Sequence, residues 1–407
     1  MSKSFQIPDY YRSSLISRIK AARRKTDHYK KDFSPSIIDL GAVRFKLARH
    51  FGFCYGVENA IEITYRAVEE NSDRRIFLLS EMIHNPHVNA DLRKRGVAFI
   101  MDTAGRYLIP WEELTREDIV IIPAFGAQSE MFEKLREIGI DPLLYNATCP
   151  FVEKVWKRSR QLGEKGYTVI IHGKHSHEET RATFSHARKS GKSLIVRDIE
   201  ETRTLADYIR GKKSMERFFQ DFPNRASEGF DPEQDLRRIG VVNQTTMLAQ
   251  ETQEISRILK EAIQERFQNT EGFANTQDTL CYATSENQTS MNALIETRGD
   301  IAIIVGGYNS SNTSHLAELC EGRLPSFYIQ DADEILDENR IRCLDLKTGE
   351  VRVMENWLPR TKTPPDFLIA AGASCPDALV DAIILKIASL FNALDRIEEA
   401  MAIYNDE

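Results

Sequence analysis

Short apolar runs alternate with helical patterns along most of this chain. Each run has the length of a strand and ends near Gly, Ser, Asn or His, and most are followed by apolar residues at three- and four-residue steps. Such alternation is typical of parallel strands joined by crossover helices, so the pattern predicts an α/β fold. The runs are RIFLLS, IVIIPAFG, YTVIIHGK, SLIVRD, IGVVNQ, IAIIVGG and DFLIAAGA.

A looser recurrence indicates how this fold is divided. A strand-like segment, a cysteine and a helix follow one another three times, as FKLARHFGFCYGVENAIEI, PLLYNATCPFVEKVWK and TQDTLCYATSENQTSM. We therefore expect three similar α/β domains, each with one cysteine in a loop where a helix begins. The predicted segments are a polar N-terminal extension (1–45), domain 1 (46–148), domain 2 (149–277) with a charged surface insertion (198–238), and domain 3 (278–407), which ends in one long amphipathic helix over 377–404.

Composition and charge narrow the class of protein. The 407 residues carry a formal net charge of −7, which disfavours a nucleic-acid binder because phosphate affinity needs a basic surface. No apolar run approaches the roughly 18 residues that a membrane-spanning helix needs. The N-terminal residues lack the apolar core of a secretory signal, so we expect a cytoplasmic protein. Six cysteines are too sparse for a disulfide framework.

Three of these cysteines occupy positions suited to metal binding. Cys54, Cys149 and Cys281 each precede a predicted helix, where free amides and the macrodipole favour a thiolate. No two of them form a C-x-x-C pair, which excludes the usual zinc-ribbon and ferredoxin spacings. Three thiolates from separate loops can hold an iron–sulfur cubane with one iron left open, but a buried cysteine that acts as a small apolar residue is the commoner case. The remaining cysteines, Cys320, Cys343 and Cys375, are assigned to that commoner case.

Eight segments, in order from about residue 48 to 385, resemble the signature segments of 4-hydroxy-3-methylbut-2-enyl diphosphate reductases. The extension and the insertion resemble the longer type found in cyanobacteria and plants. The resemblance implies a cloverleaf of three α/β domains around one [4Fe-4S] cluster, held by Cys54, Cys149 and Cys281 with an open iron site. It also implies reductive dehydroxylation of the allylic diphosphate to isopentenyl and dimethylallyl diphosphate, the last step of the non-mevalonate isoprenoid pathway. The segments are GFCYGVENAI, IHNPHVNADLRKRGV, NATCPFVEKV, GKHSHEET, NQTTM, CYATSENQ, GGYNSSNTSHLAE and AGASCPDALV.

Polar residues after two of the apolar runs suit a diphosphate. Ser310, Ser311 and Asn312 follow a strand and two glycines and precede a helix, and Ser374 follows the same pattern as the expected cap of the next helix. Hydroxyls and free amides at a helix start bind phosphate readily, although such residues are often only caps. All four match diphosphate-binding positions of the family, as does His84.

Three further residues match the family's catalytic positions. Glu179 is the implied proton donor, His177 binds substrate or delivers a proton, and Thr245 bonds near the substrate alcohol. An acidic residue before a helix is usually only a charge that complements the dipole, so these roles come from the resemblance. One departure is visible: many bacterial members have a second histidine facing the diphosphate where this chain has Phe125.

The sequence also bears on the source of electrons, and it leaves two alternative functions open. The chain has no G-x-G-x-x-G nucleotide fingerprint after a strand, and the resemblance implies a ferredoxin or flavodoxin as donor. One alternative is an iron–sulfur hydro-lyase, which would turn over without reductant. Another is a non-catalytic iron–sulfur or zinc sensor, which colour and absorption would distinguish.

Overall fold

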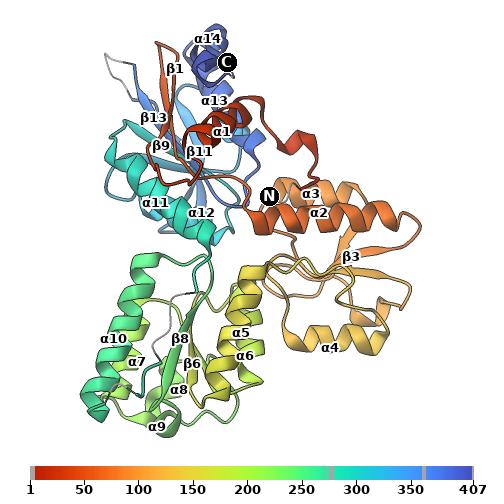
Figure 1. Ribbon diagram of the computed structural model, residues 1–407, viewed down its shortest axis with the longest axis vertical. Helices are drawn as coiled ribbons and strands as arrows, with labels where there is room; N and C mark the ends of the chain where they lie inside the picture. Colours follow the sequence, from red (N-terminus) through yellow and green to blue (C-terminus); the bar gives the residue numbers. More distant parts are fainter. Residues whose placement is uncertain (1–4, 270, 275–278, 360–363, 406–407) are drawn as a thin grey trace. The chain divides into compact units, whose positions relative to one another are not determined.

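The computed structural model describes residues 5–269, 271–274, 279–359 and 364–405. The chain forms two compact units: unit 1 comprises Met1–Glu58, His84–His87 and Tyr282–Glu407, and unit 2 comprises Asn59–Ile83 and Val88–Cys281. The described strands form three sheets, of seven, three and three strands, connected largely by helices (Figure 1). The predicted α/β class is confirmed, and each apolar run identified above contains a strand.

Unit 1 is built on the seven-stranded sheet, in the order β1-β2-β13-β9-β10-β11-β12. The middle pairs β2–β13, β13–β9 and β9–β10 are parallel, whereas the outer pairs at both edges are antiparallel. The central strands β9 and β13 are buried along almost their whole length, as expected for parallel strands that are covered on both faces. The strands are β1 (Ser36–Asp39), β2 (Arg44–Leu47), β9 (Ile301–Val305), β10 (Ser326–Ile329), β11 (Arg340–Asp345), β12 (Glu350–Glu355) and β13 (Asp366–Ala371).

The helices of unit 1 share one apolar core with this sheet. Helix α13 buries Val380, Ile383, Ile384 and Ile387 at helical spacing, and α1 adds Leu15, Ile16 and Ile19 to the same cluster. The helices are α1 (Ser14–Thr26), α11 (Tyr282–Glu296), α12 (Ser311–Glu318), α13 (Asp377–Leu390) and α14 (Ile397–Met401), with 3-10 turns η1 (Asp9–Tyr11), η4 (Ala332–Glu334), η5 (Leu394–Arg396) and η6 (Ala402–Tyr404).

The C-terminal stretch predicted as one helix over 377–404 is divided. Helix α13 ends at Leu390, and Asn392 adopts a left-handed backbone with φ of 52°. Since helical spacing of apolar residues continues through η5 and α14, the pattern alone does not reveal the break.

Unit 2 contains the two three-stranded sheets, and both are entirely parallel. The first, β4-β3-β5, comprises β3 (Ile76–Leu78), β4 (Val97–Phe99) and β5 (Ile119–Ile121), with α4 (Ser129–Ile138) and η2 (Trp111–Glu113). Helices α2 (Tyr55–Glu70) and α3 (Pro86–Lys94) begin in unit 1 and continue into unit 2. Short βαβ units of this kind bring the carboxyl ends of neighbouring strands to one edge.

The second sheet of unit 2, β7-β6-β8, is covered on both faces (Figure 1). Residues of α5 and α6 pack on one side, and residues of α7 and α10 pack on the other. The elements are β6 (Thr168–His172), β7 (Ser193–Val196), β8 (Ile239–Asn243), α5 (Pro150–Glu164), α6 (Glu178–Arg188), α7 (Ile199–Ile209), η3 (Met215–Arg217), α8 (Phe218–Asp221), α9 (Pro232–Asp235) and α10 (Ala249–Phe267).

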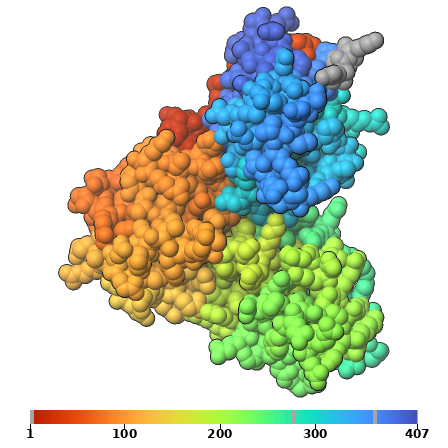
Figure 2. Space-filling view, turned by 180° about the vertical axis from the view of Figure 1, so that it is seen from behind, coloured from red at the N-terminus to blue at the C-terminus, as the bar shows by residue number. Residues whose placement is uncertain are grey.

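The segment 198–238, expected as a surface insertion, contributes both surface and core. Many of its charged residues are exposed, and the segment falls in the yellow-green to green part of the surface in Figure 2. Tyr208, Phe218, Phe222 and Phe230 are buried in the cluster that also contains α7 and α10 residues. The predicted domain boundaries at 148 and 277 remain predictions, and residue 277 lies outside the described residues.

No helix in the described ranges combines the length and the apolar character needed to cross a bilayer.

Candidate active site

The ends of two parallel strands meet at the start of α12 in unit 1. Strands β9 and β13 are neighbours, and each is followed by glycine, Gly306 and Gly372 respectively. A Cβ on either glycine would collide with the side chain of Thr313 in α12. The absence of side chains at these two positions therefore allows the helix start to approach both strand ends closely.

Polar side chains at this junction form what we call the anion cradle: Ser310, Ser311, Asn312 and Ser374. Ser310 is the N-cap of α12, and its Oγ accepts hydrogen bonds from the amide of Thr313 at 3.3 Å and from the Thr313 hydroxyl at 2.9 Å. The amide of Ala373 donates to Asn312 Oδ1 at 2.8 Å. All four cradle residues are buried.

Ser374 and His84 join the cradle through another contact. Ser374 Oγ donates to the carbonyl oxygen of His84 at 3.2 Å and lies 3.5 Å from Ser310 Oγ. Ser374 does not cap α13 as expected, because Pro376 occupies the N-cap position. The structure thus brings together the predicted diphosphate residues His84, Ser310, Ser311, Asn312 and Ser374.

Two atoms of the cradle are donors without a partner in the described part of the chain. Ser311 Oγ and Asn312 Nδ2 are both buried and form no hydrogen bond there. Each residue is only 4% exposed. An unmet buried donor costs free energy, so two of them at a positive helix end indicate a site for an anion.

Cys54 is held by the same turn that carries Ser374. Its amide donates to the carbonyl of Ala373 at 3.2 Å, and its own carbonyl accepts from the amide of Glu58 at 2.9 Å. Cys54 therefore directly precedes α2, as predicted, and it is half-buried.

Glu179 and Thr245 form a closed pair in unit 2. The Thr245 amide donates to Glu179 Oε1 at 2.6 Å, and the Thr245 hydroxyl donates to Oε2 at 2.9 Å. Glu179 is 1% exposed and Thr245 is 5% exposed. His177 is the N-cap of α6, and its Nδ1 accepts from the Glu179 amide at 3.2 Å. The three residues assigned to catalysis are thus contiguous in space.

Gln244 is a residue that the sequence analysis missed. Its Oε1 accepts hydrogen bonds from the amide of Lys174 at 3.2 Å and the hydroxyl of Thr180 at 3.0 Å. Its Nε2 donates to the hydroxyl of Thr246 at 2.7 Å. Gln244 therefore joins the loop after β8 to the start of α6, which carries Glu179. The signal in the sequence was a pair of amides, Asn243 and Gln244, directly after the apolar run of β8.

Cys149 and Cys281 both lie near this pair. The Cys281 amide donates to the carbonyl of Thr245 at 3.1 Å. Burial raises the pKa of the Cys149 thiol to about 11; the amides of Phe151 and Val152 lower it, and the neighbouring Cys281 and Glu179 raise it. The helix-start amides lower the pKa of Cys149 as expected, but desolvation outweighs them, so the net shift does not favour the thiolate that was predicted.

The cysteines fall into two groups, and none forms a disulfide. Cys54, Cys149 and Cys281 are half-buried, whereas Cys320, Cys343 and Cys375 are buried. Burial raises the pKa of Cys320 to about 12, which suits an inert core thiol. Among the described residues, no three His, Cys, Asp or Glu side chains are grouped closely enough to hold a single metal ion.

Phe125 lies against the predicted catalytic histidine. Its ring centroid is 5.7 Å from that of His177, with the rings at 84° to one another. An edge-to-face contact of this kind restrains the imidazole. In place of a second histidine, this chain therefore has an aromatic side chain that packs against His177.

Three sheets that contain parallel strands, half-buried cysteines at helix starts, a buried carboxylate and an anion cradle indicate an α/β enzyme that acts on an anionic substrate. The chain belongs to the LytB protein family, whose family model matches residues 45–388. The family resemblance inferred from the sequence is thus confirmed.

Curated relatives agree along most of the chain. A protein of Gloeobacter violaceus is 37% identical over 385 residues, covering 93% of this chain and 88% of that protein. One of Prochlorococcus marinus (strain NATL1A) is 38% identical over 389 residues, covering 93% and 94%. Both are named 4-hydroxy-3-methylbut-2-enyl diphosphate reductase. The relatives are mostly cyanobacterial, as expected for the longer type.

Two solved structures are also similar. One, described as (E)-4-hydroxy-3-methyl-but-2-enyl diphosphate reductase, the terminal enzyme of the non-mevalonate pathway, is 26% identical with a TM-score of 0.51 and covers 84% of this chain and 98% of its own. The other, the E-1-hydroxy-2-methyl-but-2-enyl-4-diphosphate reductase from Plasmodium falciparum, has a TM-score of 0.58 and covers 83% and 86%. At 21% identity, the second supports the fold alone.

Proposed function

We propose that this chain reduces (E)-4-hydroxy-3-methylbut-2-enyl diphosphate to isopentenyl diphosphate and dimethylallyl diphosphate, the last step of the non-mevalonate isoprenoid pathway. The chain is an oxidoreductase of the LytB family, and its relatives carry the name of this reductase. The reaction consumes two electrons and two protons and releases the hydroxyl group as water. The observation that carries the proposal is a buried carboxyl, Glu179, bonded to a hydroxyl beside two cysteines.

The anion cradle binds the diphosphate. Ser311 Oγ and Asn312 Nδ2 supply the two donors that lack partners in the described residues, and the start of α12 supplies backbone amides. Ser310 and Ser374 hold the turn in shape through their mutual contact, and His84 completes the set. The cradle donors are neutral, whereas the phosphate oxygens are charged. Hydrogen bonds from these donors to phosphate are therefore charge-assisted, and they stabilise the complex more than hydrogen bonds to a neutral acceptor would.

Glu179 holds the proton that leaves with the hydroxyl. A proton on Oε2 would donate to Thr245 Oγ1, which lies 2.9 Å away and is then free to turn its own hydrogen toward the substrate oxygen. The Thr245 amide on Oε1 and the His177 cap at the Glu179 amide keep the carboxyl oriented. A buried acid relayed through a hydroxyl can act near neutral pH, where an exposed carboxyl is already ionised.

Enzymes of this family use an iron–sulfur cluster. We assign it as one [4Fe-4S] cluster held by Cys54, Cys149 and Cys281, with one iron open. Support comes from cysteines that are half-buried and form no disulfide, and from the electrostatic effect of Cys281 on Cys149, since a cationic iron would offset the negative charge of two neighbouring thiolates. When bound, the cluster supplies electrons one at a time and a Lewis-acidic iron position. A four-iron cluster also separates its ligands more widely than a single ion does.

Electrons come from a protein donor, a ferredoxin or flavodoxin. The sequence has no nucleotide-binding fingerprint of the Rossmann type, so we do not propose a directly bound nicotinamide as the source of the electrons.

Anaerobic purification followed by an iron and sulfide count tests the proposal, with turnover then measured using a chemical reductant. We expect about four irons and four sulfides per chain and conversion of the allylic diphosphate only when reductant is present. Equal turnover without reductant would make the protein a hydro-lyase, and a cluster with no turnover of this substrate would make it a binding protein. Bound zinc in place of iron would overturn the redox assignment.

A further inference from the structure

The N-terminal segment, residues 5–31, contacts the residues on both sides of Cys54. We call Phe51–Tyr55 the Cys54 loop. Phe5 packs edge-on against Tyr55 with ring centroids 5.0 Å apart, and Tyr11 packs against Phe53 at 5.8 Å. Lys20 also contacts this loop at Phe51, so three side chains of the segment reach it.

Lys20 makes the polar contact among the three. Its Nζ donates to the carbonyl of Phe51 at 3.0 Å and to both carboxylate oxygens of Asp377 at 2.8 Å, and it lies 4.7 Å from the centre of the Phe51 ring. Both partners are largely screened from water, with the Lys20 side chain 30% exposed and the Asp377 side chain 19%. Lys20 therefore joins the Cys54 loop to the first turn of α13.

Gly52 makes this arrangement possible. Its φ is 82°, in the left-handed region, and a Cβ there would collide with Asp377 Oδ1. A glycine leaves the loop backbone with many accessible conformations unless other contacts restrict it. On the amino side of Cys54, the hydrogen bond from Lys20 to the Phe51 carbonyl restricts the backbone. The Cys54 amide itself donates to the carbonyl of Ala373.

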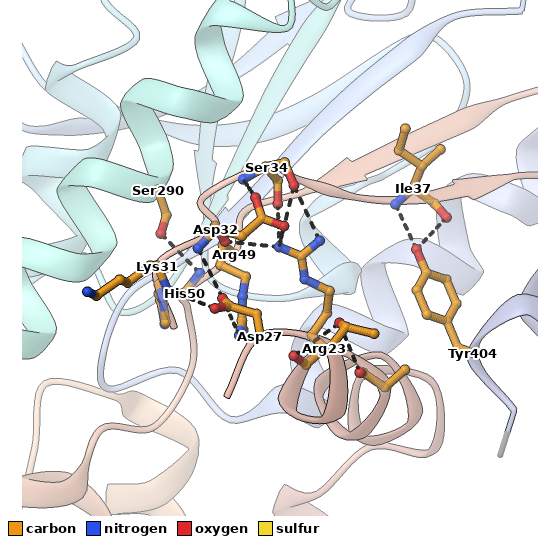
Figure 3. A network of polar contacts seen from close by, with 12 residues as sticks. Arg23, Asp27, Lys31, Asp32, Ser34, Ile37, Arg49, His50, Ser290 and Tyr404 are labelled. Carbon is orange, nitrogen blue, oxygen red and sulfur yellow. Dashed lines mark hydrogen bonds and ion pairs between the residues drawn. The ribbon is translucent and has the colours of Figure 1, made fainter. Parts of the chain in front are cut away.

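A second anchor lies just before the loop (Figure 3). Arg49 Nη2 pairs with Asp27 Oδ2 at 3.3 Å, and the two side chains are only 7% and 11% exposed. Asp27 also accepts from the amides of Lys31 and Asp32, which fixes the carboxylate at the end of α1. The next residue, His50, donates its amide to Ser290 Oγ at 3.1 Å. The two residues that lead into the Cys54 loop, Arg49 and His50, are therefore both held by polar contacts.

The segment is itself fixed in unit 1. Leu15, Ile16 and Ile19 of α1 are buried in the main core cluster, and α1 packs on α13. Ser13 caps α1, and Asp381 of α13 accepts from the amide of Leu15 at 3.3 Å. Contacts made by α1 with the loop therefore come from a rigid base.

We propose that the N-terminal segment is a clasp that positions Cys54 for cluster binding, with Lys20 as its positioning residue. This rests on the proposed function, since it takes Cys54 to be a cluster ligand. Loss of the Lys20 contacts frees the peptide before Cys54, so the thiolate is presented less often in one orientation. Residues that orient metal ligands from outside commonly matter about 10- to 100-fold for metal affinity.

The test compares Lys20→Met with Arg24→Met in the full chain. Arg24 lies one turn further along α1 and is exposed. Replacing it with Met removes the same positive charge. After anaerobic purification, we expect Lys20→Met to lose iron to a chelator about tenfold faster than wild type. Arg24→Met should match wild type. The EPR spectrum of the reduced cluster should change in Lys20→Met and not in Arg24→Met, while the Tm of the two iron-free proteins stays similar.

Two further variants separate positioning from general stability. Lys20→Arg, which keeps a donor and a charge, should restore most of the iron retention. Asp377→Asn should lose iron faster than wild type, and its effect should not add fully to that of Lys20→Met, because both break one contact. These variants also serve if Lys20→Met folds poorly.

The outcomes distinguish the two proposals. A wild type that holds its cluster, together with a Lys20→Met variant of unchanged iron retention and EPR spectrum, overturns the positioning role alone. A wild type that cannot be loaded with a cluster overturns the proposed function, and the role of Lys20 with it.

Discussion

The anion cradle of unit 1 and the Glu179–Thr245 pair of unit 2 are both buried at the carboxyl ends of parallel strands, yet their hydrogen bonds are completed differently. In the cradle, Ser311 Oγ and Asn312 Nδ2 have no partner among the described residues. In the pair, both carboxylate oxygens of Glu179 accept from Thr245. Strand ends of this kind are where α/β proteins bind ligands, and the difference matches the roles that we propose for the two sites.

The physical reason is the unequal cost of burying neutral and charged groups. A neutral donor left without a partner costs roughly 1–3 kcal/mol, which a folded protein tolerates where a ligand will supply the missing acceptor. A buried carboxylate left without partners costs far more, or takes up a proton. A binding surface can therefore be left open for its ligand, whereas an acid that moves a proton must be held by the protein itself.

The largest expected effect comes from replacing the cysteines that we propose as iron ligands. Cys149→Ser and Cys281→Ser, near the Glu179–Thr245 pair, and Cys54→Ser should each lose bound iron and more than about 100-fold of the activity, since each removes a direct ligand. Cys320→Ser should keep both, because Cys320 is buried in the apolar core of unit 1. Iron and sulfide counts on the anaerobically purified variants check this, and full iron in Cys149→Ser would exclude that residue as a ligand.

Replacing the acid should abolish turnover without removing the metal. Glu179→Gln keeps the size of the side chain but cannot carry the proton, so kcat should fall about 10²- to 10⁴-fold at normal iron content. Thr245→Val should lower kcat through loss of the hydroxyl relay, and Thr245→Ser, which keeps the hydroxyl, is the control. Wild-type kcat in Glu179→Gln would remove the proton-donor role from this carboxyl.

The iron-free protein offers a test of the electrostatics near Glu179. Because burial raises the pKa of Cys149 to about 11, its thiolate is scarce at pH 8 and its reactivity should increase as pH rises toward 11. Against an ordinary thiol of pKa about 8.5, alkylation at pH 8 should be about 100-fold slower. Mass spectrometry after iodoacetamide labelling measures this, with the urea-unfolded chain as reference. An inflection near or below 8.5 in the folded protein would mean that the helix start outweighs burial.

The smallest effect tests the open donor of the cradle. Ser311→Ala should raise KM about tenfold through loss of one hydrogen bond to a charged ligand, with little change in the free energy of unfolding because Ser311 Oγ has no partner to lose in the described chain. Ser310→Ala should instead cost about 1 kcal/mol of stability, since Ser310 caps α12. Steady-state kinetics and urea unfolding of the two variants check both. Equal destabilisation would remove the distinction between donor and cap.

The amino-acid sequence determined the local elements and the chemistry of the protein. Runs such as IAIIV and DFLIAA became β9 and β13 because apolar β-formers bounded by glycine have few other stable states. The ordered cysteine, serine and glutamate motifs were sufficient to identify the family, which the comparisons confirm. These features are local, so each could be recognised within a short window of sequence.

The tertiary structure decided what depends on residues far apart in the chain. β2 pairs with β13 across more than three hundred residues, Gln244 joins the NQTTM loop to α6, and Lys20 reaches the peptide before Cys54 and the start of α13. The pKa of Cys149 followed burial rather than its place at a helix start. Burial, long-range pairing and desolvation are set by which distant atoms pack around a group, and local periodicity carries no record of them.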